Sequence, residues 1–436
     1  MTLVQALIAS SVTTAADEST IGLRSTPSKK AQIPALVRAH AFATLGKMCL
    51  IDEALAKKSV PLFIREIEKS SDESVRNNVV IVMCDLCVKY TSVVDRYIAK
   101  ISESMCDKSP LVRRNALSLL TQVIAEDFVK WKPLILFRFL FKLTDQCEVV
   151  SKYAEYALCV VLPRKNPTLL FNHMIDAIFV FNRCSSHPSH NNYLQSEREL
   201  SLFNCSGPSP EQIARRFQIY KFLLHQLSSE QILDLHVRLH SDVLGMFADE
   251  SIPIHADVLT DILNMLSWPQ FKLRSITNVI HNEQNHAMND MNEEEQEVTT
   301  KVGSIQGKLI EGFLKKHISE VVIPIIVELK RTLEKKRSPL LRQVMLYLQL
   351  IMSEYKNESS NFLIQDKQTA KEIEFDLKRI SAQKEAHLVN RRISTPSSTT
   401  KVPFCTPVRS PYPTSNTNTM MTPSRRRSSV TRPTPS

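Results

Sequence analysis

The stretch that decides the fold is Asp107-Lys108-Ser109-Pro110-Leu111-Val112-Arg113-Arg114-Asn115-Ala116-Leu117. Its Val112-Arg113 pair has counterparts at Val37-Arg38, Val75-Arg76 and Val150-Ser151, spaced by 38, 37 and 38 residues. In every copy the positions four, eight and eleven residues further on are apolar, which is the spacing of one buried face of an amphipathic helix. These three columns are Ala41, Val79, Ala116 and Ala154; Leu45, Met83, Leu120 and Leu158; and Met48, Leu86, Val123 and Val161. Each copy therefore predicts a helix in the same register.

A second apolar segment follows each copy, at residues 61–67, 94–101, 134–143 and 168–181. Two helices per period near 38 residues are typical of a HEAT-type α-solenoid, in which neighbouring repeats stack to share one core. Only 7 Gly among 436 residues disfavours a turn-rich β protein. The predicted fold is all-α: a HEAT-repeat α-solenoid with a long charged C-terminal helix and a disordered basic tail.

The pattern divides the chain into seven parts. These are residues 1–32, a partial helix and linker; 33–181, HEAT repeats; 182–208, a loop; 209–280, degenerate helical repeats; 281–300, an acidic loop; 301–390, C-terminal helices that include the charged helix 365–388; and 391–436, a tail of Ser, Thr, Pro and Arg. Helix start signals precede two segments: Ser209 with Pro210 and Gln212, and Ser228 with Gln231.

Positive charge is concentrated at the end of the chain. From Leu388 to Ser436 there are eight basic residues and no acidic one, so this segment holds most of the formal net charge of +10. It has too few apolar residues to offset the entropy of ordering, which predicts disorder.

The cysteines indicate a reducing compartment, and the lengths of the apolar runs indicate that the chain does not span a membrane. Nine cysteines are scattered through apolar helical segments instead of framing loops, which favours cytosol or nucleus. No apolar run approaches the roughly 18 residues of a spanning helix, and we expect no membrane partner. The apolar run near the start lacks a basic flank and is broken by Gln5, so it is not interpreted as a signal peptide.

Two cysteine patterns have alternative interpretations. Cys84 and Cys87 form a CxxC, but Cys87 shares a repeat column with Cys49 and Cys84 shares one with Gly46, so we interpret both as packing residues. A zinc site is the other candidate, from ligand types that gather near the predicted loop. Its four residues are Cys184, His187, His190 and Cys205.

Arginines recur at matched repeat positions. Arg38, Arg76 and Arg113 could form a ladder of phosphate contacts, or each could join its helix to a neighbouring repeat through a carboxylate such as Asp72 or Asp107. We favour the structural role. Better candidates for DNA lie off the repeat consensus. They are Lys57, Lys58, Arg215, Arg216, Lys315, Lys316, Lys330, Arg331, Lys335, Lys336, Arg337 and, in the tail, Arg425, Arg426 and Arg427.

No catalytic constellation is recognised. The chain has no GxxxxGK[ST] loop, GxSxG elbow or HExxH pair, and it has few glycines with which to cradle phosphate. We predict a protein that is not an enzyme and needs no cofactor.

Kinase patterns cluster in the tail. Thr406 and Thr422, like Thr26 in the N-terminal linker, precede Pro and have a basic residue three positions on, as cyclin-dependent kinases prefer. Further candidate phosphosites are Ser394, Thr395, Ser410, Ser428 and Ser429. Each phosphate adds about −1.5 to −2 charges, so about five would cancel the charge of the tail.

The repeat sequences resemble the condensin non-SMC core domain. The resemblance lies in residues 33–50, 75–97 and 110–116. More narrowly, residues 195–199, 219–224 and 304–356 are similar to the D-type HEAT subunits of condensin II. The resemblance implies a subunit that binds the kleisin bridging a pair of SMC ATPases, contacts chromatin and DNA, and receives mitotic kinase input. Because family members are much longer, we expect the chain to be a C-terminal portion.

The function hypothesis is a nuclear, chromosome-bound scaffold subunit acting in mitotic chromosome condensation. One alternative is a generic HEAT adaptor in nuclear transport or phosphatase assembly. Another is a zinc-dependent enzyme, which would require the Cys184 site.

Overall fold

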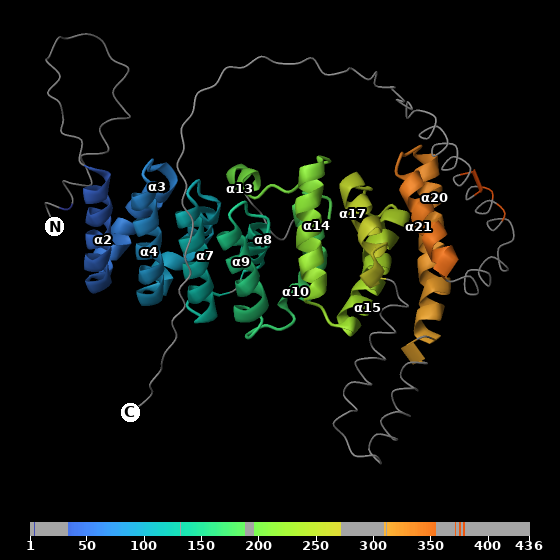
Figure 1. Ribbon diagram of the computed structural model, residues 1–436, viewed down its shortest axis with the longest axis horizontal. Coiled ribbons are helices and arrows are strands. Elements are labelled where there is room, and N and C mark those ends of the chain that lie inside the picture. Colours follow the sequence, from blue (N-terminus) through green and yellow to red (C-terminus); the bar gives the residue numbers. More distant parts are fainter. Residues whose placement is uncertain are drawn as a thin grey trace, which may run out of the picture. The chain divides into compact units, whose positions relative to one another are not determined.

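The computed structural model describes residues 4, 34–130, 132–187, 196–271, 309–310, 312–354, 371, 375, 378 and 379. All of them belong to one compact unit, residues 1–380. Every regular element among these residues is a helix, and the helices stand side by side in chain order (Figure 1). The predicted all-α repeat fold is confirmed.

The four aligned repeats form helix pairs. The first helices are α2 (Ala35–Ile51), α4 (Glu73–Lys89), α7 (Pro110–Ala125) and α9 (Glu148–Tyr156), the last continuing into the π-helical η4 (Ala157–Val161). The second members are α3 (Glu53–Lys69); α5 (Thr91–Val94), η2 (Asp95–Tyr97), α6 (Ile98–Glu103) and η3 (Ser104–Cys106); α8 (Pro133–Lys142); and α10 (Leu169–Asn172) with α11 (Met174–Phe181).

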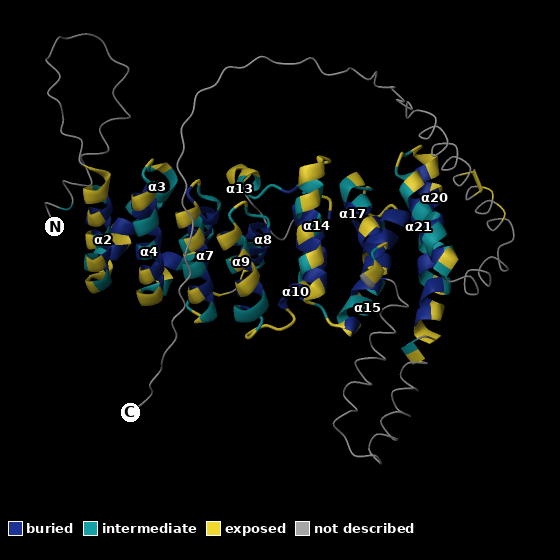
Figure 2. Cartoon of the chain, viewed as in Figure 1, coloured by how far each residue is buried: buried dark blue, intermediate teal, exposed yellow. Residues whose placement is uncertain are grey.

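The repeat register describes the core well. The columns four and eight residues after the repeat valine are fully buried in all four copies, and Figure 2 shows buried and exposed faces on each helix. Val37 is the exception among the valines at 42 % exposed. Met48 and Val161 are half-buried. Val161 lies in the π-helical turn, where one extra residue per turn rotates the face out of register.

The predicted loop 182–208 is wrong in its second half, which contains helix α13 (Glu197–Leu202). Ser196 begins this helix with a full capping box: its hydroxyl accepts from the Glu199 amide, and the Glu199 carboxylate accepts from the Ser196 amide at 2.7 Å. The Ser-x-x-Glu spacing was the signal for this helix. Its shortness and its polar surroundings hid it.

Helices continue after this insertion. They are α14 (Pro210–His225), α15 (Ser229–Arg238), the π-helical η5 (Leu239–Leu244), α16 (Gly245–Ala248), α17 (Ala256–Leu266), η6 (Pro269–Phe271), the π-helical η7 (Ile318–Val322), α20 (Ile323–Lys335) and α21 (Leu341–Glu354). Ser209 caps α14 as predicted, but Gln212 does not complete a capping box there. Ser228 and Gln231 do form one at α15.

Several predicted segments lie outside the described residues. They are the linker 1–32 apart from residue 4, the acidic loop 281–300, most of the charged helix 365–388, and the tail 391–436. These assignments stay predictions, as do the phosphosites at Thr26 and in the tail.

Candidate interaction surface

The repeat arginines link successive turns of the stack. Arg76, near the start of α4, donates from Nε and Nη2 to the two carboxylate oxygens of Asp107, at 2.7 and 2.8 Å. Its Nη1 donates to the carbonyls of Ser70 and Ser71 in the preceding turn, at 2.9 Å each. The guanidinium thus joins the turn before its helix to the turn before the next repeat, using the planar fork that Arg offers.

Arg113 repeats this arrangement one period later. Its Nη2 donates to Asp145 at 2.9 Å, and its Nη1 donates to the carbonyls of Asp107 and Lys108 at 3.0 and 3.1 Å. Burial raises the pKa of Asp145, but the cations Lys142 and Arg113 together with a backbone amide outweigh burial and hold that pKa below its usual value. Asp107 serves both arginines, with its side chain and with its carbonyl, so the links form a continuous ladder.

The ladder changes at its two ends. Arg38 pairs with Glu66 at 2.5 Å, because the position that corresponds to Asp107 is Ser70 in that repeat. In the fourth repeat Ser151 takes the arginine position, and its hydroxyl donates to the Leu143 carbonyl at 2.8 Å. Asp72, which we had considered as an arginine acceptor, instead caps α4 by accepting from Ser74.

The structure contradicts Arg216 as a candidate DNA contact. Its side chain is 1 % exposed and donates from Nε to Asp261 at 2.7 Å. The same Asp261 oxygen accepts from Tyr220 at 3.2 Å and from Asn182 at 2.9 Å. Because a buried guanidinium with a paired carboxylate does not reach a phosphate in solvent, Arg216 is a core residue. Its neighbour Arg215 is 31 % exposed and pairs with Glu211 on its own helix.

Lys330 is also wrong as a DNA contact, since its side chain is 6 % exposed and its ammonium lies 3.1 Å from Glu334. The other candidates within the described residues lie at the surface of their helices. Lys316 pairs loosely with Glu320, Arg331 with Glu328 and Lys336 with Glu250. The rest are Lys57, which pairs with Glu53 of its own helix at 2.7 Å, and Lys58, Lys315, Lys335 and Arg337. The tail arginines Arg425, Arg426 and Arg427 lie outside the described residues.

The proposed zinc quartet is not brought together by the structure. His187 is buried and stacks flat on Phe179, with ring centroids 3.6 Å apart. Cys184 and Cys205 are buried, and burial raises the pKa of the Cys205 thiol to about 12, which disfavours a thiolate. His190 lies outside the described residues. Among the described residues, no group of three metal-binding side chains includes any of the other three.

The CxxC consists of packing residues. Cys84 and Cys87 are buried, and burial raises the pKa of both thiols, that of Cys87 to about 11. A redox pair needs an accessible thiol with a low pKa, so burial and the raised pKa both disfavour a redox role. The column of Cys84 is a position of close helix approach: a Cβ on Gly46 would lie 2.3 Å from a methyl group of Val82.

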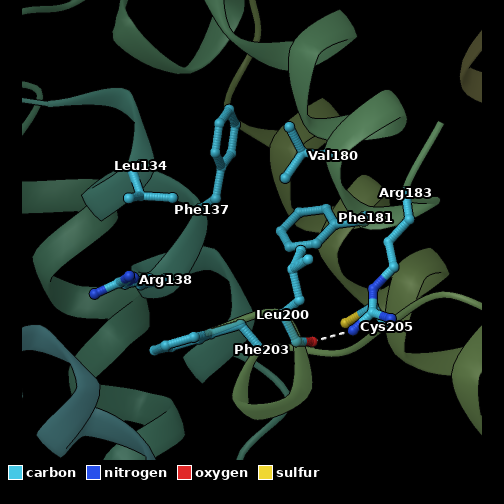
Figure 3. A pocket seen from close by; sticks show the side chains of 9 residues that line it. All are labelled: Leu134, Phe137, Arg138, Val180, Phe181, Arg183, Leu200, Phe203 and Cys205. Atoms are coloured by element: carbon cyan, nitrogen blue, oxygen red, sulfur yellow. Dashed lines mark hydrogen bonds between the residues drawn. The ribbon is translucent and has the colours of Figure 1, made fainter. Parts of the chain in front are cut away.

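A buried arginine that sequence reasoning missed holds α13 in place. Arg138 of α8 is 1 % exposed, contacts Ser102 of α6 and Glu199 of α13, and lies 4.8 Å from the centre of the Phe203 ring. It lines the small cavity of Figure 3, where Arg183 also donates to a carbonyl of α13. The cavity of about 20 Å³ has room for about one water molecule, so it is not a ligand site.

Known protein families match most of the chain. The family description "Condensin-2 complex subunit D3-like. HEAT repeats" matches residues 1–67 and 271–388, and "non-SMC mitotic condensation complex subunit 1" matches residues 74–237. Relatives are Condensin-2 complex subunit D3-L of Xenopus laevis, 38% identical over 88% of this chain and 26% of its own length, and Condensin-2 complex subunit D3 of Mus musculus, 38% over 81% and 23%. Condensin-2 complex subunit CAP-D3 of Arabidopsis thaliana is 33% identical over 82% and 27%.

The all-helical repeat fold and the arginine ladder define a HEAT-repeat protein. The chain spans about a quarter of the length of these curated relatives. It belongs to the family of condensin-2 subunit D3-like HEAT-repeat proteins. The matched families describe condensin subunits, and none is an enzyme family. No helix in the described part of the chain combines the length and apolarity needed to span a membrane.

Proposed function

We propose that the chain is a non-catalytic scaffold of a condensin II complex, acting in the nucleus on mitotic chromosomes and joining the kleisin and SMC subunits to chromatin and DNA. The observation that carries the proposal is the match to D3-type condensin subunits over most of the chain. The arginine ladder supports the proposal physically. Because its arginines bond one repeat to the next, the repeats are held at a fixed distance from each other, as a scaffold surface requires.

The surface for kleisin is a column of exposed apolar residues on the first helices. Leu36, Leu111 and Val149 each precede the repeat valine by one residue and are 64%, 48% and 54% exposed. They lie in the first turns of α2, α7 and α9. The second repeat has Ser74 in this column, so the exposed apolar pair on the adjacent helices α7 and α9 fits an apolar segment of an extended partner chain.

Recovery of partners from mitotic extract tests the scaffold and this surface together. The tagged chain is expected to recover SMC and kleisin subunits, and Leu111→Glu with Val149→Glu to recover less kleisin. Ile51→Glu is the control, since Ile51 is 88% exposed at the far end of α2. Recovery of transport cargo or phosphatase subunits without SMC proteins would favour the generic HEAT adaptor and sink the proposal.

For DNA, we assign the contact to Lys335 and Lys336 at the end of α20 and to the basic tail. Binding of duplex DNA is expected to weaken in Lys335→Glu with Lys336→Glu, and the salt dependence to become shallower by about one for each lost phosphate contact. Lys47→Glu with Lys152→Glu changes the charge equally at other exposed positions and serves as control. An equal loss in both variants would mean that only net charge matters.

Regulation by mitotic kinases would act through the tail. Phosphate on Thr406 and Thr422 lowers its positive charge, so kinase treatment is expected to weaken DNA binding. The comparison is Thr406→Ala with Thr422→Ala under the same treatment. Unchanged binding of the treated native chain would contradict this switch.

A further inference from the structure

Three buried histidines from two distant segments meet inside the stack. His236 lies near the end of α15, His240 follows in η5, and His317 immediately precedes η7. Their exposed fractions are 4%, 0% and 6%. One ring nitrogen from each lies within 4.8 Å of the other two. Positions four apart on a helical turn share one face, so His236 and His240 present a pair toward His317.

Two of the ring nitrogens have no hydrogen-bond partner, and the third histidine is fully bonded. His240 Nδ1 donates to the His236 carbonyl at 2.8 Å, so its Nε2 accepts from the Tyr347 hydroxyl at 2.9 Å. Nδ1 of His236 and Nε2 of His317 are buried and have no hydrogen-bond partner in the structure. A buried polar atom left without a partner destabilises the fold, so these two nitrogens call for a ligand.

The surroundings keep the rings neutral and dry. Burial lowers the pKa of all three histidines, to about 4 for His240, and the neighbouring imidazoles lower it further for His236 and His240. Phe313 stacks parallel to the His317 ring, with centroids 6.1 Å apart, and Phe271 lies beside His236. Neutral imidazole is the form that binds metal ions.

We propose that His236, His240 and His317 form a structural site for one transition-metal ion of the zinc class. Three imidazoles suit Zn²⁺, and binding through His240 Nε2 would take the lone pair that now accepts from the Tyr347 hydroxyl and release that hydroxyl as a fourth oxygen ligand. The hydrogen bond from His240 Nδ1 to a backbone carbonyl is the usual support of a metal-bound histidine. Because Val237 follows His236 where a zinc hydrolase of the HExxH type has its glutamate, this helix lacks that general base, and we assign the site a structural role.

The site joins α15 and η5 to η7. The element η5 packs against η7 and α20, and the chain between η5 and η7 passes through α16, α17 and η6 and then through residues 272–308, which lie outside the described part. Ligand nitrogens around a tetrahedral zinc stand about 3.4 Å apart, since each bond is about 2.1 Å, so the cluster would contract slightly on loading. Two of the three described π-helical segments, η5 and η7, lie at the cluster, and such segments are frequent at functional sites. This inference is independent of condensin assembly.

Metal analysis of the full chain tests the site. After loading with Zn²⁺ and gel filtration, the native chain is expected to retain about one zinc per molecule and to unfold at higher temperature than the chelator-treated form. His317→Phe keeps the stacking on Phe313 but removes a ligand, and is expected to retain at least about tenfold less zinc. His40→Gln, at an exposed histidine, should retain as much as the native chain.

X-ray absorption at the zinc edge keeps the test decisive if a variant fails to fold. Three imidazoles predict nitrogen neighbours at about 2.0 Å, whereas cysteine binding would give sulfur at about 2.3 Å. Sulfur neighbours, no retained zinc in the native chain, or undiminished zinc in a folded His317→Phe would each overturn the proposal.

Discussion

Arg113 and Arg114 are adjacent in the sequence but have opposite environments. Arg113 is 15% exposed in its side chain and bonded to two turns, whereas Arg114 is exposed on the same helix. Arg113→Ala leaves the Asp145 carboxylate with one cation fewer and two carbonyls without their donor. We expect it to lower the free energy of unfolding by about 2 to 3 kcal/mol, somewhat less than for a fully buried pair.

Urea denaturation followed by circular dichroism measures this difference. Arg114→Ala is the matched control and is expected to change the free energy of unfolding by less than about 0.5 kcal/mol. Equal effects of the two substitutions would show that the ladder contributes nothing beyond helix propensity.

Asp145 predicts a pH dependence. Its folded pKa lies below the ordinary 3.8, so the unfolded chain binds the proton more readily. The stabilisation is therefore complete above about pH 4 and is lost as the pH falls through the lower folded pKa. The free-energy difference between the native chain and Asp145→Asn is expected to be largest at pH 7 and to shrink toward pH 3. Asp249→Asn, at an exposed position, should show no such trend; a constant difference for Asp145→Asn would contradict the assignment.

The roles of individual residues could be predicted from the sequence only within the four aligned repeats, residues 33–181. The register identified Cys84, Cys87 and the arginine column, because each has counterparts one period away. It could not separate Arg216 from Arg215, since the partner Asp261 lies on a later helix outside any aligned repeat. The histidine cluster escaped for the same reason: the His236 and His240 pair was visible, but His317 is brought to it only by packing.

At the scale of the helix, Gly46 sets how closely α2 and α4 approach. Gly46→Ala is expected to destabilise the chain by about 1 kcal/mol or more, because overpacking against Val82 outweighs the better helix propensity of Ala. Gly312→Ala is the control, since a Cβ there meets nothing within 4 Å, and it should stabilise by up to about 1 kcal/mol. Thermal unfolding compares the two variants. If both substitutions stabilise the chain, α2 and α4 can move apart at little energetic cost, which would contradict the prediction.

Helix starts matched the sequence prediction where a capping serine precedes a long helix. Ser209 and Ser228 begin helices as their sequences predict, with Pro210 at the first helical position. The helix α13 was missed although it has the same capping signal, because its six residues include none that is buried and its position depends on Arg138. Short helices held by polar contacts with distant residues, as α13 is by Arg138 and Arg183, leave no periodic pattern to recognise.

At the scale of the molecule, coupling in the described stack should be local. Each repeat of a solenoid contacts mainly its neighbours, so its stability is approximately a sum of repeat and interface contributions. Arg113→Ala is therefore expected to speed amide hydrogen exchange in α7 and α9 while leaving α20 and α21 nearly unchanged. Uniformly faster exchange would instead indicate one cooperative unit.

The arginine ladder also gives the stack a direction. Arg76 and Arg113 each reach toward the acidic turn that follows their own repeat, Arg76 toward Asp107 and Arg113 toward Asp145. Cutting the stack at one of these junctions would leave an unpaired cation on the N-terminal piece and an unpaired carboxylate on the C-terminal piece. The two cut faces are therefore complementary to each other, whereas two copies of either face repel. Polarity of this kind favours rejoining in the native order and disfavours stacking of like ends.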